Sequence, residues 1–489
     1  MNGTLLTHIA VLAPAGSAAV LLLLMLLRFC IEYTLKVLPG RLARFLPTSG
    51  RISRAVCWGA TFVCLLSLLA LPSIPDPWSL RASSPFLALS PHTWLLAVSI
   101  GVVLLCSAVA AWAFDASTPT WVALGTLASA ALTALTATHP ALILLSLDIA
   151  YVVLGLSLAL GGSPDSTAAV GSLRRAARRF LTFTVLSSAA CWVGIVYLPS
   201  DPRAHWLLAA GLLSRALSFP FHTPSLSAHA RLPTPLAMIF LGAVAPAAAI
   251  AATTTLGYSP HLALFLLLAS AWSYAASLRE SDLRRVAGRW AAAALSAALA
   301  IGLATLSPLP PDHPALGLLP PTTAFASPTP LTLLMIAAIV GAAAITYLAA
   351  TVERAVGHHQ IPRMGGLAAR LPGVFGWTIA TAFLLAGAPP FASFAGRLLT
   401  LTTPHLTPAA TATALPLLLT ALWVLALACS LQVIHRIFLG IPRQDAPPTE
   451  LTARERLVLI LLCTTALATS LSPLTLLRPP TPIPTTSNH

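Results

Sequence analysis

Charge is the feature that this sequence lacks most clearly. Only 8% of the 489 residues are charged, whereas 57% are hydrophobic and the mean hydropathy is +0.86. Soluble domains carry about 25% charged residues, so the composition excludes a water-soluble globular protein. Apolar runs of about 20 residues, each long enough to cross a bilayer as a helix, recur along the chain and exclude a β-barrel. The fold class is therefore predicted to be all-α and polytopic.

Lysine, asparagine and paired cysteines are also scarce. Lys36 is the only lysine, and Asn2 and Asn488 are the only asparagines, which indicates a codon bias. The cysteines form no C-x-x-C pair and fall mostly inside apolar runs, so they are expected to be small core residues. They are Cys30, Cys57, Cys64, Cys106, Cys191, Cys429 and Cys463. We expect no metal site and no cofactor in this chain.

The net charge of +14 comes from arginines in short loops between the apolar runs. They are not interleaved with aromatic residues on one basic face, so no nucleic-acid partner is predicted. About fourteen transmembrane helices are predicted, including the first, which lacks the basic start of a signal peptide. The spans are 5–29, 54–73, 92–114, 119–138, 141–161, 180–198, 206–224, 234–256, 260–278, 289–307, 331–351, 373–396, 411–438 and 455–476.

Basic residues in short loops mark the side of a membrane that is not translocated, and here they cluster in odd-numbered loops. The clusters follow spans 1, 5, 9, 11 and 13 and include Lys36, Arg41, Arg44, Arg51, Arg174, Arg175, Arg178, Arg179, Arg279, Arg284, Arg285, Arg354, Arg363, Arg370, Arg443 and Arg454. Both termini are therefore predicted on the translocated side. Residues 1–489 are expected to form one membrane domain that ends in a flexible tail, 479–489.

Few ionisable residues fall inside the predicted spans, and each is costly there unless it is paired or hydrated. Asp148 lies in span 5 and is expected either to transfer ions or to bond to a neighbouring helix. Arg397, at the end of span 12, is either buried or reaches the interface as an anchor.

Span 7 is predicted to be a broken helix, because Pro220 and Pro224 free backbone carbonyls that need water or a cavity. The nearby Arg215 and His222 indicate a hydrated pocket, with His222 as a candidate proton relay. His229 is expected in the loop toward span 8, either as a second relay or as a solvated or a structural histidine.

One run of residues resembles a known family. Arg215-Ala-Leu-Ser-Phe-Pro220-Phe-His222-Thr, Ala228-His229, Leu232-Pro233-Thr234-Pro235 and Leu241-Gly242 match, without a gap, a motif of the antiporter-like subunits of respiratory complex I. These subunits share a fold with cation/proton antiporter and membrane-hydrogenase subunits. Further similar segments are Arg178-Arg179-Phe180, Ser281-Asp282-Leu-Arg284-Arg285, Gly365-Gly366-Leu367 and Leu385-Ala-Gly-Ala-Pro389-Pro390-Phe. The C-terminal segment, from His435-Arg436 to Glu450 and Arg454-Glu455, is most similar to the subunit 4 branch, called M in bacteria.

The resemblance implies two inverted five-helix repeats, 119–256 and 260–438, each with a broken helix. It places Asp148 at the family's helix-5 glutamate, Arg215 at the helix-7 lysine and Arg397 at the helix-12 glutamate. Pro246 takes the position of the family's second lysine, and Ala294 lies near the position of a family histidine. The series of side chains that would pass protons along the bundle therefore looks degenerate. Arginine also stays protonated where a lysine can release its proton.

The implied function is that of a membrane-arm subunit of proton-translocating NADH:ubiquinone oxidoreductase, which contributes to proton translocation or scaffolds it. The redox chemistry would belong to other subunits. The implied partners are the other membrane-arm subunits, notably the subunit 2-like and subunit 5-like ones, and membrane lipids. The alternative is a subunit of a cation/proton antiporter or membrane-bound hydrogenase. The expected location is the mitochondrial inner membrane, with the bacterial plasma membrane as the alternative.

Overall fold

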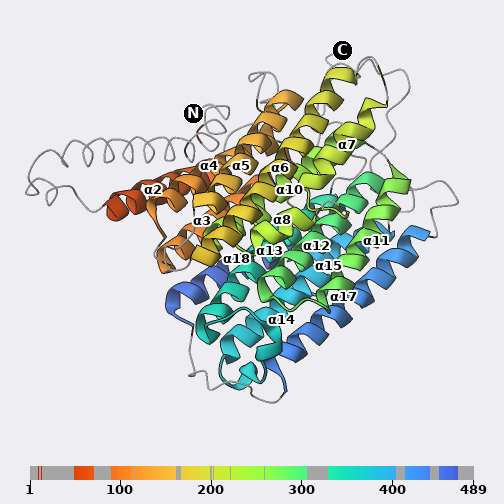
Figure 1. Cartoon of the computed structure of the whole chain (residues 1–489). Coiled ribbons are helices and arrows are strands. Elements are labelled where there is room, and N and C mark those ends of the chain that lie inside the picture. The colour runs from red at the N-terminus through yellow and green to blue at the C-terminus, as the bar shows by residue number, and fades with distance from the viewer. Residues whose placement is uncertain are drawn as a thin grey trace, which may run out of the picture.

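The computed structural model describes residues 49–70, 90–160, 167–198, 201–305, 329–402, 414–440 and 451–471, apart from positions 115, 202, 221 and 258, together with residues 9, 13 and 87. In this part of the chain the regular elements are helices, and eight of them are long and apolar enough to cross a membrane. They pack side by side in one bundle (Figure 1). The prediction of an all-α polytopic membrane protein is confirmed.

The described helices follow the predicted spans in order. Their bounds are α2 (Ser49–Ala70), α3 (Pro91–Ala113), α4 (Thr118–Thr136), α5 (Pro140–Leu160), α6 (Thr167–Tyr197), α7 (Ala204–Arg215), α8 (Thr223–His229), α9 (Thr234–Ile239), the π-helical turn η4 (Phe240–Val244), α10 (Ala245–Leu256), α11 (Pro260–Ser277), α12 (Leu283–Thr305), α13 (Thr329–Val356), the 3₁₀ turns η5 (Ile361–Arg363) and η6 (Leu367–Ala369), α14 (Pro372–Ala386), α15 (Ala392–Thr402), α17 (Ala414–Phe438) and α18 (Ala453–Leu471).

Some predicted features fall elsewhere than expected or outside the described residues. Span 6 was placed at 180–198, but α6 begins at Thr167, so the arginines assigned to the preceding loop are helical. The reason is that alanine and arginine favour helix, and a basic helix can extend beyond the hydrocarbon. Span 1 apart from residues 9 and 13, the tail 479–489 and both termini lie outside the described residues, and the inverted repeats stay a prediction.

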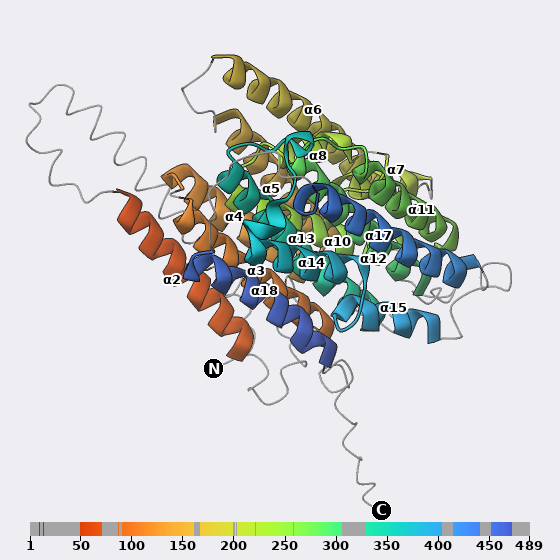
Figure 2. The ribbon, with the colours of Figure 1, turned by 90° about the horizontal axis from the view of Figure 1, so that it is seen from below.

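Helix α13 and the continuous rod α9–η4–α10 form the centre of the bundle, since their hydrophobic windows are entirely buried (Figures 1 and 2). Small residues allow close approach here: a Cβ on Gly242 would lie 3.0 Å from the carbonyl oxygen of Ile339. The six described cysteines are buried and unpaired, which confirms the prediction for Cys57, Cys64, Cys106, Cys191, Cys429 and Cys463.

Two helices are broken inside the bundle, and both breaks have the same local structure. Helix α7 ends at a Schellman motif in which Ser218 N–H donates to Leu213 O at 3.1 Å, and α14 ends with Ala388 N–H donating to Phe383 O at 2.8 Å. The left-handed residue is Leu217 (φ 58°) in the first break and Gly387 (φ 84°) in the second. The prediction of a broken span 7 is therefore confirmed.

A buried tyrosine satisfies a carbonyl at each break, as the absence of water in a bilayer requires. Tyr151 of α5 donates to the carbonyl oxygen of Arg215, the last residue of α7. Tyr274 of α11 donates to the carbonyl oxygen of Leu385 in α14, over 3.1 Å. Each broken helix is thus held by a partner helix.

Contacts between loops test the predicted topology. Arg284 at the start of α12 pairs with Glu353 at the end of α13, and Arg354 pairs with Glu455 at the start of α18. Arg436 donates to Leu278 O over 2.5 Å and joins the ends of α17 and α11. The prediction that loops 9, 11 and 13 share one face, called the basic face below, is confirmed.

Cysteine labelling can test which side of the membrane the basic face meets. In sealed membranes, Arg363→Cys is expected to react with an impermeant maleimide only from the side that is not translocated, because basic loops stay there. Asp201→Cys, in the exposed loop between α6 and α7, should react only from the opposite side. The unmodified chain, whose described cysteines are buried, gives the background. Labelling of both variants from one side would contradict the topology.

Candidate functional site

Asp148 and Arg215 form an ion pair inside the bundle, at the point where α7 breaks. A carboxylate oxygen of Asp148 accepts a hydrogen bond from Nη2 of Arg215. The Arg215 side chain is fully buried, and that of Asp148 is 20% exposed. Asp148 therefore bonds to a neighbouring helix, as one of its two expected roles required, and a buried cation in a membrane requires such compensation.

Three further side chains orient the pair. Trp192 Nε1 donates to the second carboxylate oxygen of Asp148 over 2.8 Å, and Arg215 Nε donates to Ser187 Oγ over 3.2 Å. The guanidinium carbon of Arg215 lies 5.6 Å from the centre of the Tyr151 ring, which adds a cation–π contact. Helices α5, α6 and α7 therefore all hold the pair, so its charges have a fixed geometry.

The chain that follows Arg215 carries a line of buried polar atoms, which we call the polar segment (residues 215–229). Five of its side-chain atoms are buried and have no hydrogen-bond partner in the described residues: Arg215 Nη1, Ser218 Oγ, His222 Nδ1, Ser225 Oγ and His229 Nδ1. His222, Ser225 and His229 recur at i, i+3 and i+7, so they lie on one face of α8. Buried polar atoms of this kind are normally satisfied by protein or by ordered water.

His229 differs from its expected loop position. It ends α8 and is 1% exposed, so the prediction of a solvated loop residue is wrong. Its ring fits because α12 has a glycine opposite: a Cβ on Gly288 would lie 3.1 Å from His229 Nδ1. Its Nε2 lies 3.4 Å from Thr346 Oγ1 of α13. Tertiary packing of α8 against α12 and α13 therefore buries this histidine.

The polar segment leads toward a charged cluster on the basic face. Arg284, one turn before Gly288 on α12, pairs with Glu353 and donates to Leu232 O over 3.0 Å. The half-exposed His359 lies 3.7 Å from Glu353 and 3.8 Å from Asp282. Titratable and polar groups thus extend from solvent toward His229.

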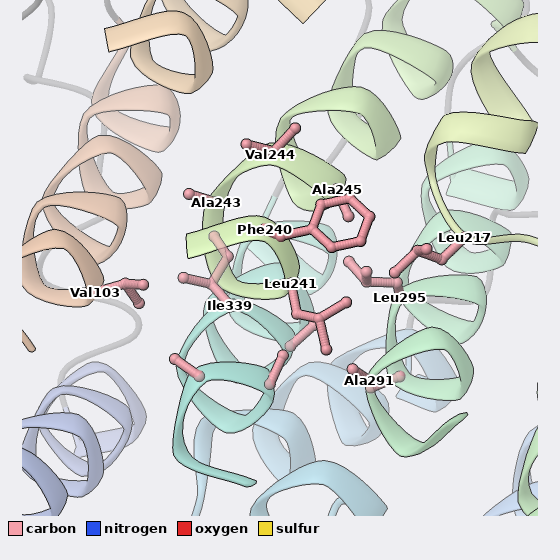
Figure 3. Close-up of a cluster of buried hydrophobic side chains, with 14 of the residues drawn as sticks. Val103, Leu217, Phe240, Leu241, Ala243, Val244, Ala245, Ala291, Leu295 and Ile339 are labelled. Carbon is pink, nitrogen blue, oxygen red and sulfur yellow. The ribbon is translucent and has the colours of Figure 1, made fainter. Parts of the chain in front are cut away.

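Hydrocarbon side chains pack around η4 in the middle of the bundle. Pro246 is fully buried in the first turn of α10, after the π-helical turn η4. The wide turn accommodates the proline, whose ring would press on the carbonyl of Gly242 in a regular α-helix. Figure 3 shows a cluster of hydrocarbon side chains at this turn, from η4, α3, α10, α12, α13 and the chain just after α7. Ala294 of α12 is also buried and carries no titratable group.

Arg397 lies in the second broken helix, in α15. It is 3% exposed, so it does not reach the interface as an anchor. No described carboxylate lies within ion-pair distance of it. Its guanidinium instead packs at the C-terminal end of α14, where a Cβ on Gly387 would meet Arg397 Nε at 2.6 Å, and lies 5.9 Å from the Trp423 ring. A helix C-terminus and an aromatic face both stabilise a cation.

Sequence reasoning missed Tyr151, Ser187 and Trp192, which orient the pair. Nothing in the spacing of these residues distinguishes them from other residues of apolar helices. It also missed Glu353 and Glu455 as partners of arginine. The scarcity of carboxylates was a usable signal, because the described acids near loops 9, 11 and 13, which are Glu280, Asp282, Glu353 and Glu455, each pair with an arginine.

The comparisons with known proteins found similarity only among solved structures. No family model matches the sequence, and no curated protein matches it. Among solved structures, a chain of the Mrp complex from Dietzia sp. DQ12-45-1b is 14% identical with a TM-score of 0.74, over 96% of this chain and 95% of that chain. A chain of respiratory complex I from Thermus thermophilus is 18% identical with a TM-score of 0.69, over 96% and 98%.

A chain of an archaeal respiratory membrane complex, the membrane-bound sulfane sulfur reductase, is 15% identical with a TM-score of 0.68, over 94% of this chain and 75% of that chain. The protein is multi-pass and shares the fold of chains in all three complexes. At this level of identity the likeness establishes the arrangement of helices, whereas the chemistry depends on the residues present here.

The ion pair gives a stability prediction. Arg215→Met leaves Asp148 without its partner and should cost roughly 3 kcal/mol, at the low end for broken buried pairs because Asp148 is partly exposed. The double variant Asp148→Leu/Arg215→Met should recover much of this loss, since no lone charge remains. Thermal unfolding in mild detergent measures both, with the exposed Arg174→Met as the matched control. Equal losses in the single and double variants would contradict the attribution of the loss to an unpaired Asp148 carboxylate.

Proposed function

We propose that this chain is a membrane-arm subunit of a proton-translocating NADH:ubiquinone oxidoreductase, of the subunit 4 branch, in the mitochondrial inner membrane. The observation that carries the proposal is the buried Asp148–Arg215 pair at the break of α7. Its support is the resemblance of residues 215–242 to the family motif and the fold shared with a chain of respiratory complex I. The electron transfer of such an enzyme takes place in other subunits.

Within this proposal, Asp148 is the residue that takes up and releases the proton. When Asp148 is protonated, Arg215 loses its counter-charge, and the resulting positive field favours release of a proton elsewhere in the subunit. Arg215 contributes to the electrostatic field but does not transfer the proton, because a guanidinium stays charged at any accessible pH. The polar segment, with His222 and His229, carries protons between this pair and the basic face.

The same proposal holds that the lateral relay of the family is interrupted here. The side chains around η4 are hydrocarbon, Pro246 and Ala294 have no titratable group, and Arg397 keeps its proton. Proton transfer needs groups that alternate between two protonation states, so translocation through this chain is rerouted along the polar segment or weakened.

A second candidate is a subunit of a cation/proton antiporter or membrane-bound hydrogenase complex. The likeness to a chain of the Mrp complex, with a TM-score of 0.74, favours it. The set of subunits that co-purify in mild detergent separates the two candidates. Subunit 2-like and subunit 5-like partners together with a quinone-reducing arm support the first, and their absence refutes it. The identity of the partners also shows whether the complex belongs to the mitochondrial inner membrane or to the bacterial plasma membrane.

Proton pumping tests the assigned roles in reconstituted vesicles. Asp148→Asn should slow proton transfer through this subunit on the order of 100-fold, because general acid–base groups contribute at least that much. His222→Phe should act in the same direction and more weakly. Both changes should lower the number of protons pumped per electron pair, because the protons translocated by this subunit are lost.

Two controls make the pumping test specific. Asp201→Asn changes an exposed loop carboxylate and should leave pumping intact. Arg397→Met replaces the charge of the second broken helix by an apolar side chain of similar length, and it too should leave pumping intact. Unchanged pumping by a fully assembled Asp148→Asn complex would show that the subunit is a scaffold.

A further inference from the structure

Four arginines near the start of α6 are not used by the site described above. Arg174, Arg175, Arg178 and Arg179 are all exposed. No described carboxylate pairs with any of them. Because α6 begins at Thr167, these side chains have helical spacing and a defined direction. They form a concentrated positive charge on a helix at the outer edge of the bundle (Figure 2).

Three of these arginines border an open cavity of about 490 Å³ between α6 and the start of α8. The cavity is lined by Arg175, Arg178, Arg179, Thr182, Phe183, Leu186 and Pro224. Along α6 these residues recur at i, i+3, i+4, i+7, i+8 and i+11, so they share one face of the helix. A volume of this size is typical of small-molecule sites.

The chemistry of this face changes in a fixed order along the helix. The three arginines come first, the Thr182 hydroxyl follows, and Phe183 and Leu186 complete the wall. From Arg175 to Leu186 the face spans roughly 16 Å, at 1.5 Å per residue. Leu186 itself is 65% exposed, and beyond it exposed apolar side chains continue along α6, with Val193 at 41% and Val196 at 67% exposed. Charged, polar and apolar groups in this order match the phosphate, ester and acyl chain of a phospholipid.

We propose that this cavity binds an anionic phospholipid, with the phosphate on Arg175, Arg178 and Arg179 and an acyl chain along α6. Only 28% of the hydrophobic window of α6 is buried inside the bundle, so its outer face is open to lipid. The arginines lie near the N-terminal end of α6, which the pattern of basic residues predicts on the side that is not translocated. Basic pockets between helices on that side are suited to anionic headgroups. The inference does not rest on the proposed function.

Native mass spectrometry of the full chain in its purified complex tests the site. After delipidation in mild detergent, the sample is offered phosphatidylglycerol or phosphatidylcholine with the same acyl chains. Phosphatidylglycerol should be retained preferentially. The triple variant Arg175→Gln/Arg178→Gln/Arg179→Gln should weaken its binding more than about tenfold, since each basic residue contributes about fivefold.

Matched variants separate the cavity from general charge effects. Arg174→Gln/Arg279→Gln/Arg363→Gln removes the same charge from exposed positions outside the cavity and should change binding less than about twofold. Thr182→Trp fills the cavity without changing charge and should also displace the lipid. Equal retention by the two triple variants would overturn the proposal. Loss of a protein subunit at unchanged lipid content would overturn it as well, by showing that the surface docks a protein.

Discussion

The structure depends on one constraint: a polar group inside hydrocarbon must find its partner within the protein. Two helices break in the middle of the bundle, and each break exposes carbonyls that a bilayer cannot hydrate. Tyr151 and Tyr274 donate to these carbonyls from neighbouring helices. Arg215 and Arg397 lie at the two breaks, at the negative ends of α7 and α14. The breaks are therefore sites where backbone dipoles and side-chain charges compensate one another.

The two breaks nevertheless differ in how their cations are neutralised. Arg215 has the carboxylate of Asp148. Arg397 has a helix end and the Trp423 ring. Hydrocarbon side chains pack around η4 (Figure 3). In our proposal, protonation of Asp148 changes the electrostatic field at the first break, and Arg397 has no described carboxylate that could do the same at the second.

Charges at the basic face are paired across loops. Two acids of this face meet arginines from other loops: Glu353 meets Arg284, and Glu455 meets Arg354. The partly exposed pair of Glu353 and Arg284 contributes little to stability, because water screens it. The main structural effect of the two pairs is to join the ends of α12, α13 and α18, which sequence order alone does not bring together.

Hydropathy and the arginine pattern determined the all-α polytopic fold, the order of the spans and the shared face of loops 9, 11 and 13. They suffice because bilayer thickness and the cost of moving arginine across it act on local sequence. Pro220 and Pro224 likewise predicted the break after Arg215. Only the tertiary structure decided that His229 is buried and that Arg397 does not reach the interface. Both depend on which helix lies opposite, and contacts between distant helices leave no periodicity in a single sequence.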